Sequence, residues 1–178
     1  MKNNKNLIEQ LGGLNPYFVT GFSDAESTFV VSISKCSRFL KKKIKTGWRV
    51  TISFALQLHK RDLPLLKQIQ AFFGVGDIYE PQGETVLYQV RSLEDVKKII
   101  NHFNKYPLIT KKQADFELFK AIVELIDRDE HKTIEGLTKI ISLRASMNRG
   151  LSEEFKKYFP AVLPFPRPSV GGQEILID

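Results

Sequence analysis

Two carboxylates, Asp24 and Glu26, stand at the end of a predicted helix, where a purely structural role does not explain them. The helix is predicted to begin after Asn15, a favourable N-cap residue, with Pro16 at its first position. The negative end of the helix dipole lies where the two acids occur, so their charges gain nothing from it. We therefore expect the acidic pair to serve a ligand. The alternative is an ordinary amphipathic helix that ends in two solvated acids.

The same helix carries small residues at a spacing that favours close packing. Gly21 and Ala25 lie four residues apart, on one helix face. A glycine inside a helix costs about 1 kcal/mol relative to alanine, so a packing reason is expected. Small residues at this spacing let a second helix backbone approach closely. We predict that Thr20, Gly21 and Ala25 form an interface with another domain or with a second copy of the chain.

The nine residues from Val19 to Ser27, VTGFSDAES, resemble the signature of the LAGLIDADG homing endonucleases. The match consists of the glycine at the third place, the acids at the sixth and eighth, and the small residue at the seventh. The ninth place is usually glycine, and here it is serine. A second family-like string, KYPLITKK, spans 105–112, and the resemblance covers 15–160. It implies a site-specific, intron-encoded DNA endonuclease that depends on a divalent metal and hydrolyses phosphodiester bonds at a long target site.

The resemblance also implies roles for the residues of the signature. Glu26 is expected to coordinate a divalent cation at the scissile phosphate, and the backbone carbonyl of Ala25 is expected to join it. Mg²⁺, or another divalent cation, suits these oxygen ligands. Asp24 is expected to be structural.

Two basic residues are further catalytic candidates by resemblance. Lys111 and Lys112 are expected to polarise the phosphate or to orient the attacking water. Many members carry a lysine one place earlier, where this chain has Thr110. The alternative is that both lysines are ordinary surface residues in the first turn of a helix.

The net charge of +7 is concentrated in one stretch of the chain. Residues 35–49 contain basic residues and no acids, whereas the rest of the chain is balanced. Such a cluster favours a polyanionic partner, nucleic acid first. A solvated basic loop and a membrane surface are the alternatives, and no amphipathic helix carries these charges as membrane binding would require. The basic residues are Lys35, Arg38, Lys41, Lys42, Lys43, Lys45 and Arg49.

Alternation of apolar and polar residues predicts half-buried strands, and capping signals predict the helices between them. The resulting order is αββαββα followed by further helices. It predicts an α+β, LAGLIDADG-like fold with an antiparallel four-stranded sheet and its helices on one face. The elements that follow the first helix are expected at 28–34, 48–59, 62–73 and 77–91, then after Ser92, after a Thr110–Gln113 capping box, and at 133–147 and 152–159.

Helices on one face leave the other face of the sheet bare, and its side chains are mostly short and hydrogen-bonding. In the family this face lies along the major groove, so the resemblance implies contact with double-stranded DNA. Arginine suits guanine and glutamine suits adenine, whereas the lysines suit phosphates. Besides the basic stretch, the expected DNA-contacting residues are Thr28, Val30, Ser32, Ser34, Thr51, Ser53, Gln57, Asp77, Tyr79, Thr85, Leu87, Gln89 and Arg91.

Composition sets the domain plan and the compartment. A single cysteine, Cys36, excludes an internal disulfide and fits a reducing compartment. No apolar run approaches the ~20 residues that span a bilayer, so no membrane partner is expected. We expect an N-terminal tail at 1–14, one endonuclease domain at 15–159, and a Pro/Gly-rich linker or tail at 160–178. The N-terminus lacks an import leader, and the resemblance implies a protein encoded in a mitochondrion or plastid, otherwise an intracellular one.

The chain carries one signature, whereas cutting two strands requires two facing acids. We therefore expect a second LAGLIDADG domain, either another copy in a homodimer or a C-terminal half. The Pro-rich tail favours the second arrangement, because a homodimer has no evident use for an exposed, extended tail. The alternative function is a nucleic-acid-binding protein that does not cut, either an intron RNA maturase or a decayed endonuclease half.

Overall fold

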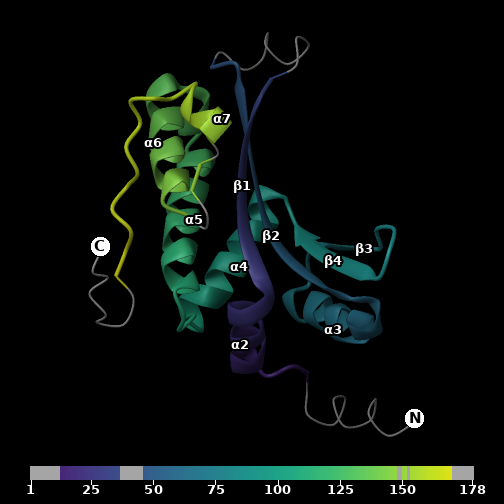
Figure 1. Cartoon of the computed structure of the whole chain (residues 1–178). Helices are drawn as coiled ribbons and strands as arrows, with labels where there is room; N and C mark the ends of the chain where they lie inside the picture. Colours follow the sequence, from purple (N-terminus) through teal and green to yellow (C-terminus); the bar gives the residue numbers. More distant parts are fainter. Residues whose placement is uncertain (1–12, 37–45, 148–149, 152, 170–178) are drawn as a thin grey trace, which may run out of the picture. The chain divides into compact units, whose positions relative to one another are not determined.

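The computed structural model describes residues 13–36, 46–147, 150–151 and 153–169 (Figure 1). None of the helices within these ranges is long and apolar enough to cross a membrane. The elements are α2 (Pro16–Glu26), β1 (Ser27–Lys35), β2 (Trp48–His59), the 3₁₀ helix η1 (Lys60–Asp62), α3 (Leu63–Phe73), β3 (Asp77–Tyr79), β4 (Thr85–Val90), α4 (Leu93–Lys105), α5 (Lys112–Asp127), the 3₁₀ helix η2 (Glu130–Lys132), α6 (Ile134–Ala145) and α7 (Glu153–Lys156).

The four strands form one sheet in the order β1-β2-β4-β3. β2 pairs with β4 in antiparallel register, with Phe54 opposite Val90 and Gln57 opposite Leu87. β3 pairs with β4, also antiparallel. The predicted α+β fold with a four-stranded antiparallel sheet is confirmed.

The chain divides into two compact units that both contain part of β2. Unit 1 comprises Met1–Thr28 and Ser53–Leu108, and therefore holds α2, α3, β3, β4 and α4. Unit 2 comprises Phe29–Ile52 and Ile109–Asp178, and therefore holds most of β1 together with α5, α6 and α7.

The core of unit 1 forms where alternate residues of β2 and β4 meet α3 and α4. Phe54 is fully buried, and its ring centroid lies 5.8 Å from that of Phe103 on α4 and 6.5 Å from that of Tyr88 on β4. The Tyr88 hydroxyl donates a hydrogen bond of 2.8 Å to the carbonyl of Val75, and burial raises the pKa of this phenol. Gly74 ends α3 with a left-handed φ of 67°, a conformation that glycine adopts without strain.

The core of unit 2 is built on the inward side chains of β1. The ring of Phe29 lies 5.6 Å from that of Phe116 and 5.2 Å from that of Phe119, both on α5. Arg144 of α6 connects β1 with the segment that follows α6. Its Nε donates to the carbonyl of Val31 at 2.9 Å, and its Nη1 donates to that of Gly150 at 3.0 Å.

The start of α5 differs from the predicted capping box. The N-cap residue is Lys111, and its side chain makes no capping hydrogen bond. Thr110 acts from one place earlier, because its Oγ1 accepts a bond of 3.2 Å from the backbone N–H of Lys112. Gln113 donates from its side chain to Glu117 on the next turn. By contrast, Ser92 caps α4 as predicted, accepting a hydrogen bond from the N–H of Asp95.

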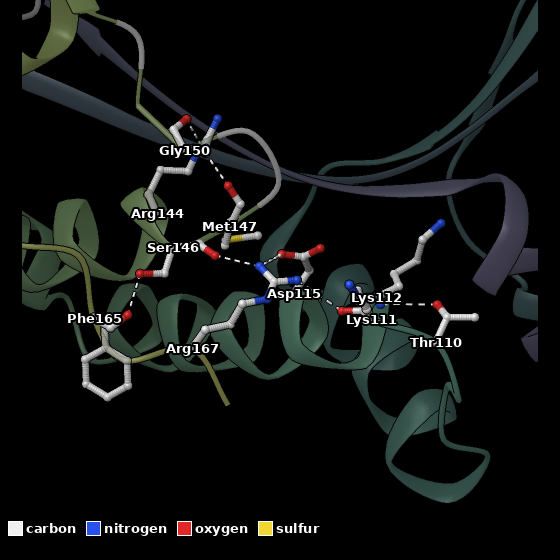
Figure 2. Close-up of polar contacts among 10 residues, drawn as sticks. All are labelled: Thr110, Lys111, Lys112, Asp115, Arg144, Ser146, Met147, Gly150, Phe165 and Arg167. Atoms are coloured by element: carbon white, nitrogen blue, oxygen red, sulfur yellow. Dashed lines mark hydrogen bonds and ion pairs between the residues drawn. The ribbon is translucent and has the colours of Figure 1, made fainter. Parts of the chain in front are cut away.

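The Pro-rich segment is extended as predicted, but its first part is held against α6 (Figures 1 and 2). The N–H of Phe165 donates to the carbonyl of Ser142 at 3.1 Å, and the Ser142 hydroxyl donates to the carbonyl of Leu163 at 2.6 Å. Residues 163–166 are exposed, as expected for the tail, but these hydrogen bonds fix the segment on α6, and Arg167 is half-buried. Residues 170–178 lie outside the described part of the chain.

Gly136 in the first turn of α6 provides a test of the packing in unit 2. A Cβ atom there would lie 2.1 Å from the carbonyl oxygen of Glu130. We expect Gly136→Ala to lower the free energy of unfolding by about 1–3 kcal/mol, as overpacking does elsewhere. Chemical denaturation followed by circular dichroism measures it. Gly21→Ala is the control, because a Cβ atom there meets nothing within 4 Å. Equal stability of Gly136→Ala and the parent would contradict this close packing.

Candidate active site and nucleic-acid interface

The signature helix α2 begins and ends through local hydrogen bonds. Asn15 Oδ1 accepts a bond of 2.8 Å from the N–H of Tyr17, which confirms the predicted N-cap. At the other end Ser27 is extended, with φ −87° and ψ 164°, so this position requires no glycine. The Ser27 hydroxyl donates to the carbonyl of Ser23 at 2.6 Å. Strand β1 therefore starts directly where α2 stops, with a serine in place of the usual glycine.

The two acids of the signature face different environments. Asp24 is 7% exposed and packs inside unit 1, which supports its expected structural role. Glu26 is exposed. Glu26 and Gln57 line the same open pocket of about 560 Å³, together with Phe22, Leu58, His59, Arg61, Asp62, Leu65 and Thr85, all in unit 1.

The oxygen atoms at the end of α2 fit a hard divalent cation. Such ions take carboxylate, carbonyl and water ligands. Glu26 supplies an exposed carboxylate, and Ala25 lies in the last helical turn, where carbonyls have no partner within the helix. No group of three or more His, Cys, Asp or Glu that could hold a metal occurs among the described residues. A cation at this helix end would need further oxygen ligands besides the Glu26 carboxylate and the Ala25 carbonyl.

The two candidate lysines lie at the start of α5 in unit 2. Lys111 is exposed and is the N-cap residue, and Lys112 is half-buried and is the first residue of the helix. Their catalytic roles stay predictions. Backbone hydrogen bonds close the turn that carries them. The N–H of Gln113 donates to the carbonyl of Thr110 at 3.0 Å, and the N–H of Ala114 donates to that of Lys111 at 3.2 Å.

The predicted outward face of β1 is exposed. Phe29 and Val31 are buried, whereas the alternate residues Val30, Ser32 and Ser34 are exposed. Thr28, Arg49 and Thr51 are exposed too.

Lys35 at the end of β1 makes cation–π contacts with two aromatic rings. Its ammonium lies 3.8 Å from the ring centroid of Tyr158 and 5.8 Å from that of Trp48, distances typical of cation–π contact. The other basic residues of this stretch lie outside the described residues, except for Arg49. These are Arg38, Lys41, Lys42, Lys43 and Lys45.

In unit 1, polar side chains of neighbouring strands form a connected network. Gln89 Nε2 donates to Ser53 Oγ at 3.0 Å, and Arg91 Nε donates to Gln89 Oε1 at 2.8 Å. The Arg91 guanidinium carbon lies 5.2 Å from the ring centroid of Tyr79. The network holds the arginine in one orientation.

Exposure on this face varies more than alternation predicts. Ser53 is only 5% exposed, because Gln89 reaches across from β4 to its hydroxyl. Ser53 therefore lies on the same face as Gln89, as predicted, but Gln89 covers it. Exposed positions are Gln57, Asp77, Tyr79 and Arg91, and half-buried positions are Thr85, Leu87 and Gln89.

The interface expected on α2 stays a prediction for the exposed Gly21 and Ala25, whereas Thr20 is buried within unit 1 and cannot belong to it. Thr20 is 5% exposed, and its hydroxyl donates to the carbonyl of Tyr106 at 3.0 Å. The same oxygen lies 3.0 Å from Nε2 of His102, which therefore acts as the donor. Thr20 directly precedes Gly21, and consecutive residues of a helix point in different directions around its axis. The side chain of Thr20 therefore faces α4, whereas Gly21 is exposed. Gly21 and Ala25 are exposed.

An apolar surface remains on α2. Tyr17 and Phe18 are 67% and 47% exposed, although both are large aromatic residues. Phe18 lies three residues before Gly21, so it belongs to the same helix face as Gly21 and Ala25. We call Phe18, Gly21 and Ala25 the α2 face.

Comparison with known proteins gives the family. The model of the LAGLIDADG endonuclease family matches residues 19–123. The chain is 37% identical over 167 residues to "Probable intron-encoded endonuclease 3" of Neurospora crassa. This match covers 93% of this chain and 30% of that protein. It is 43% identical over 161 residues to "Probable intron-encoded endonuclease 2" of the same organism, with 89% and 34% covered. The chain belongs to the LAGLIDADG endonuclease family, as its signature indicates.

Solved structures agree with this assignment. A structure of I-SmaMI bound to an uncleaved DNA target in the presence of calcium ions superposes with a TM-score of 0.84 and 43% identity. The match covers 92% of this chain and 55% of that one. The chain thus spans about half of that solved chain and about a third of the two curated relatives.

The half-buried imidazole of His102 leads to a pH-dependent prediction. Burial lowers the pKa of His102 from 6.5 to about 4, so the ring is neutral in the folded chain. Unfolding restores the higher pKa, and the stability that depends on the neutral ring is present above pH 6.5 and is lost as the pH falls toward 4. Denaturation at a series of pH values should show this loss. His102→Gln should flatten the curve between pH 6.5 and 4, whereas a change at the exposed His59 should not. An equally steep loss in His102→Gln would exclude the buried ring as its cause.

Proposed function

We propose that this chain forms one DNA-binding, metal-binding part of a site-specific homing endonuclease that hydrolyses phosphodiester bonds in double-stranded DNA. The observation that carries the proposal is the exposed Glu26 carboxylate at the end of the signature helix, beside Gln57, while its neighbour Asp24 is buried. The relatives named as probable intron-encoded endonucleases and the DNA-bound I-SmaMI support the same activity for this chain.

Metal binding and stabilisation of the phosphate are assigned to different residues of the chain. Glu26 and the carbonyl of Ala25 hold Mg²⁺ or another divalent cation. When bound, such an ion supplies positive charge that lowers the pKa of water and stabilises charge on the phosphate. Lys111 and Lys112 add positive charge that polarises the phosphate. Gln57 offers hydrogen bonds in the pocket that Glu26 lines.

Sequence recognition falls to the exposed residues of the strands. Arg91 is held between Gln89 and Tyr79, because its Nε and Nη2 both donate to Gln89 Oε1, and its Nη1 is the donor proposed to reach a base edge. Arg49 and Gln57 are further base-contacting candidates. The lysines of the basic stretch bind phosphates and fix the register of the protein on the duplex.

The α2 face is the proposed contact with a second LAGLIDADG domain. Cleavage of both strands requires a second metal-binding acid, and one signature supplies one exposed carboxylate. The partner is either another copy of this chain or a C-terminal half. The names of the relatives support a gene inside an intron, and we infer an organelle genome, mitochondrial or plastid, as its location.

Glu26→Gln tests the metal role. The amide keeps the shape of the side chain but loses the charge that binds the cation, so we expect cleavage to be abolished and DNA affinity to stay within about twofold. The measurement is plasmid nicking on a target library with Mg²⁺, with and without a second LAGLIDADG domain, together with a DNA-binding titration.

Glu124→Gln is the matched control, since it removes the same charge from an exposed position on α5. We expect it to cleave like the parent. Cleavage by Glu26→Gln at the parent rate would refute its metal role. A parent that binds DNA or intron RNA but never cuts would favour the non-cleaving alternative.

Gly21→Leu tests the α2 face. The position is exposed, and an added Cβ atom would meet nothing within 4 Å outside the local helix backbone, so the isolated chain should be at least as stable as the parent. A leucine would hold a second helix away, and we expect self-association at micromolar concentration to weaken at least about tenfold, or about 1.4 kcal/mol. Light scattering measures it. Asn101→Leu, at an exposed position on α4, serves as control. Unchanged association in Gly21→Leu would place the contact elsewhere.

A further inference from the structure

Arg167, in the Pro-rich segment, connects three parts of unit 2 (Figure 2). Its Nη1 donates to Asp115 Oδ1 on α5 at 2.9 Å and to the carbonyl of Ser146 after α6 at 2.7 Å. Its Nη2 donates to the carbonyl of Lys111 at 3.1 Å. No local sequence pattern singles out this residue, because it lies 52 positions from Asp115 and 56 from Lys111.

The segment that carries Arg167 is held in place before it reaches α5. Leu163 and Phe165 are bonded to Ser142, and the Ser146 hydroxyl donates to the carbonyl of Phe165. Pro164, Pro166 and Pro168 alternate with these residues, and each proline restricts its own φ. The backbone of the segment is therefore restrained, and it holds the Arg167 guanidinium at the start of α5.

The ion pair with Asp115 is better shielded from water than surface pairs of this chain. The side chains of Arg167 and Asp115 are 29% and 13% exposed, against 58% and 65% for the Lys132–Asp129 pair. Exposed pairs contribute little, since water and salt screen them. The shielded Arg167–Asp115 pair, with two further bonds from Arg167 to the carbonyls of Ser146 and Lys111, restrains these residues more strongly than an exposed pair would.

The restrained partner is the turn with the candidate lysines. Lys111 lacks a side-chain cap of its own, and its carbonyl accepts from Arg167 on one side and from the N–H of Ala114 on the other. Thr110 holds the N–H of Lys112 from within the turn. Arg167 thus fixes the backbone from which both lysines extend.

We propose that Arg167 is a positioning residue for catalysis: it couples the Pro-rich segment to the start of α5 and sets the orientation of Lys111 and Lys112. The inference rests on the proposed function, because it assigns these lysines to the phosphate. It also gives the segment 163–167 a role in positioning the two lysines beyond that of a connection.

The test compares Arg167→Ala with Arg128→Ala in the full chain. Arg128 pairs with Glu130 at the other end of α5, at 2.8 Å, and is 60% exposed. Two measurements are made well below the unfolding temperature: hydrogen exchange of the amides of 112–115, and the single-turnover cleavage rate of bound DNA with a second LAGLIDADG domain present. For Arg167→Ala we expect about tenfold faster exchange at these amides. We also expect a cleavage rate lower by about tenfold or more, with DNA affinity unchanged. Arg128→Ala should change neither.

Arg167→Lys separates geometry from charge. A lysine keeps the charge but cannot reproduce the planar fork that spans Asp115 and two carbonyls, so we expect it to remain impaired. Full rescue by lysine, or unchanged exchange in Arg167→Ala, would overturn the proposal. Faster exchange with an unchanged cleavage rate would also overturn it, leaving a stabilising contact only. A parent chain that never cleaves contradicts the proposed function instead, and the exchange measurement still decides whether Arg167 holds the turn.

Discussion

The direct passage from α2 to β1 is the constraint on which the candidate site depends. The helix ends at Glu26 and the strand starts at Ser27, with no loop between them. Both the N–H and the hydroxyl of Ser27 bond to the carbonyl of Ser23, so the helix end cannot unwind without losing two hydrogen bonds. Because the backbone is fixed there, Asp24 points into unit 1 and Glu26 toward solvent. Two acids that look equivalent in the sequence therefore have different chemistry.

The same junction limits what the chain can do by itself. It exposes one carboxylate beside a pocket, and it leaves the α2 face bare on the same helix. A hard cation needs six or more oxygen ligands, and these two residues supply a minority of them. In the proposed assembly, DNA, water and a second domain would supply the further ligands and the helix partner. That assembly would account for both the apolar exposure of α2 and the incomplete donor set.

The features that the sequence predicted are those with a local cause. The bounds of β2, the Asn15 and Ser92 caps and the exposed Glu26 all follow from alternation, capping or the signature itself. The features that it missed depend on residues distant in sequence. Ser53 is covered because the strand register brings Gln89 near it. Thr20 turns inward because His102 on α4 and the C-cap residue Tyr106 both hydrogen-bond to it. Arg167 joins α5 across more than 50 residues. None of these has a local signal.

The network of Ser53, Gln89 and Arg91 has a consequence for how target preference can change. Gln89 uses its amide nitrogen on Ser53 and its amide oxygen on Arg91, so one side chain sets the rotamers of two neighbours. Substitutions at residues in one hydrogen-bond network do not have additive effects. On a surface proposed to recognise base pairs, substitutions at Ser53, Gln89 and Arg91 would therefore change target preference jointly. A new preference would require all three positions to be chosen together and not one at a time.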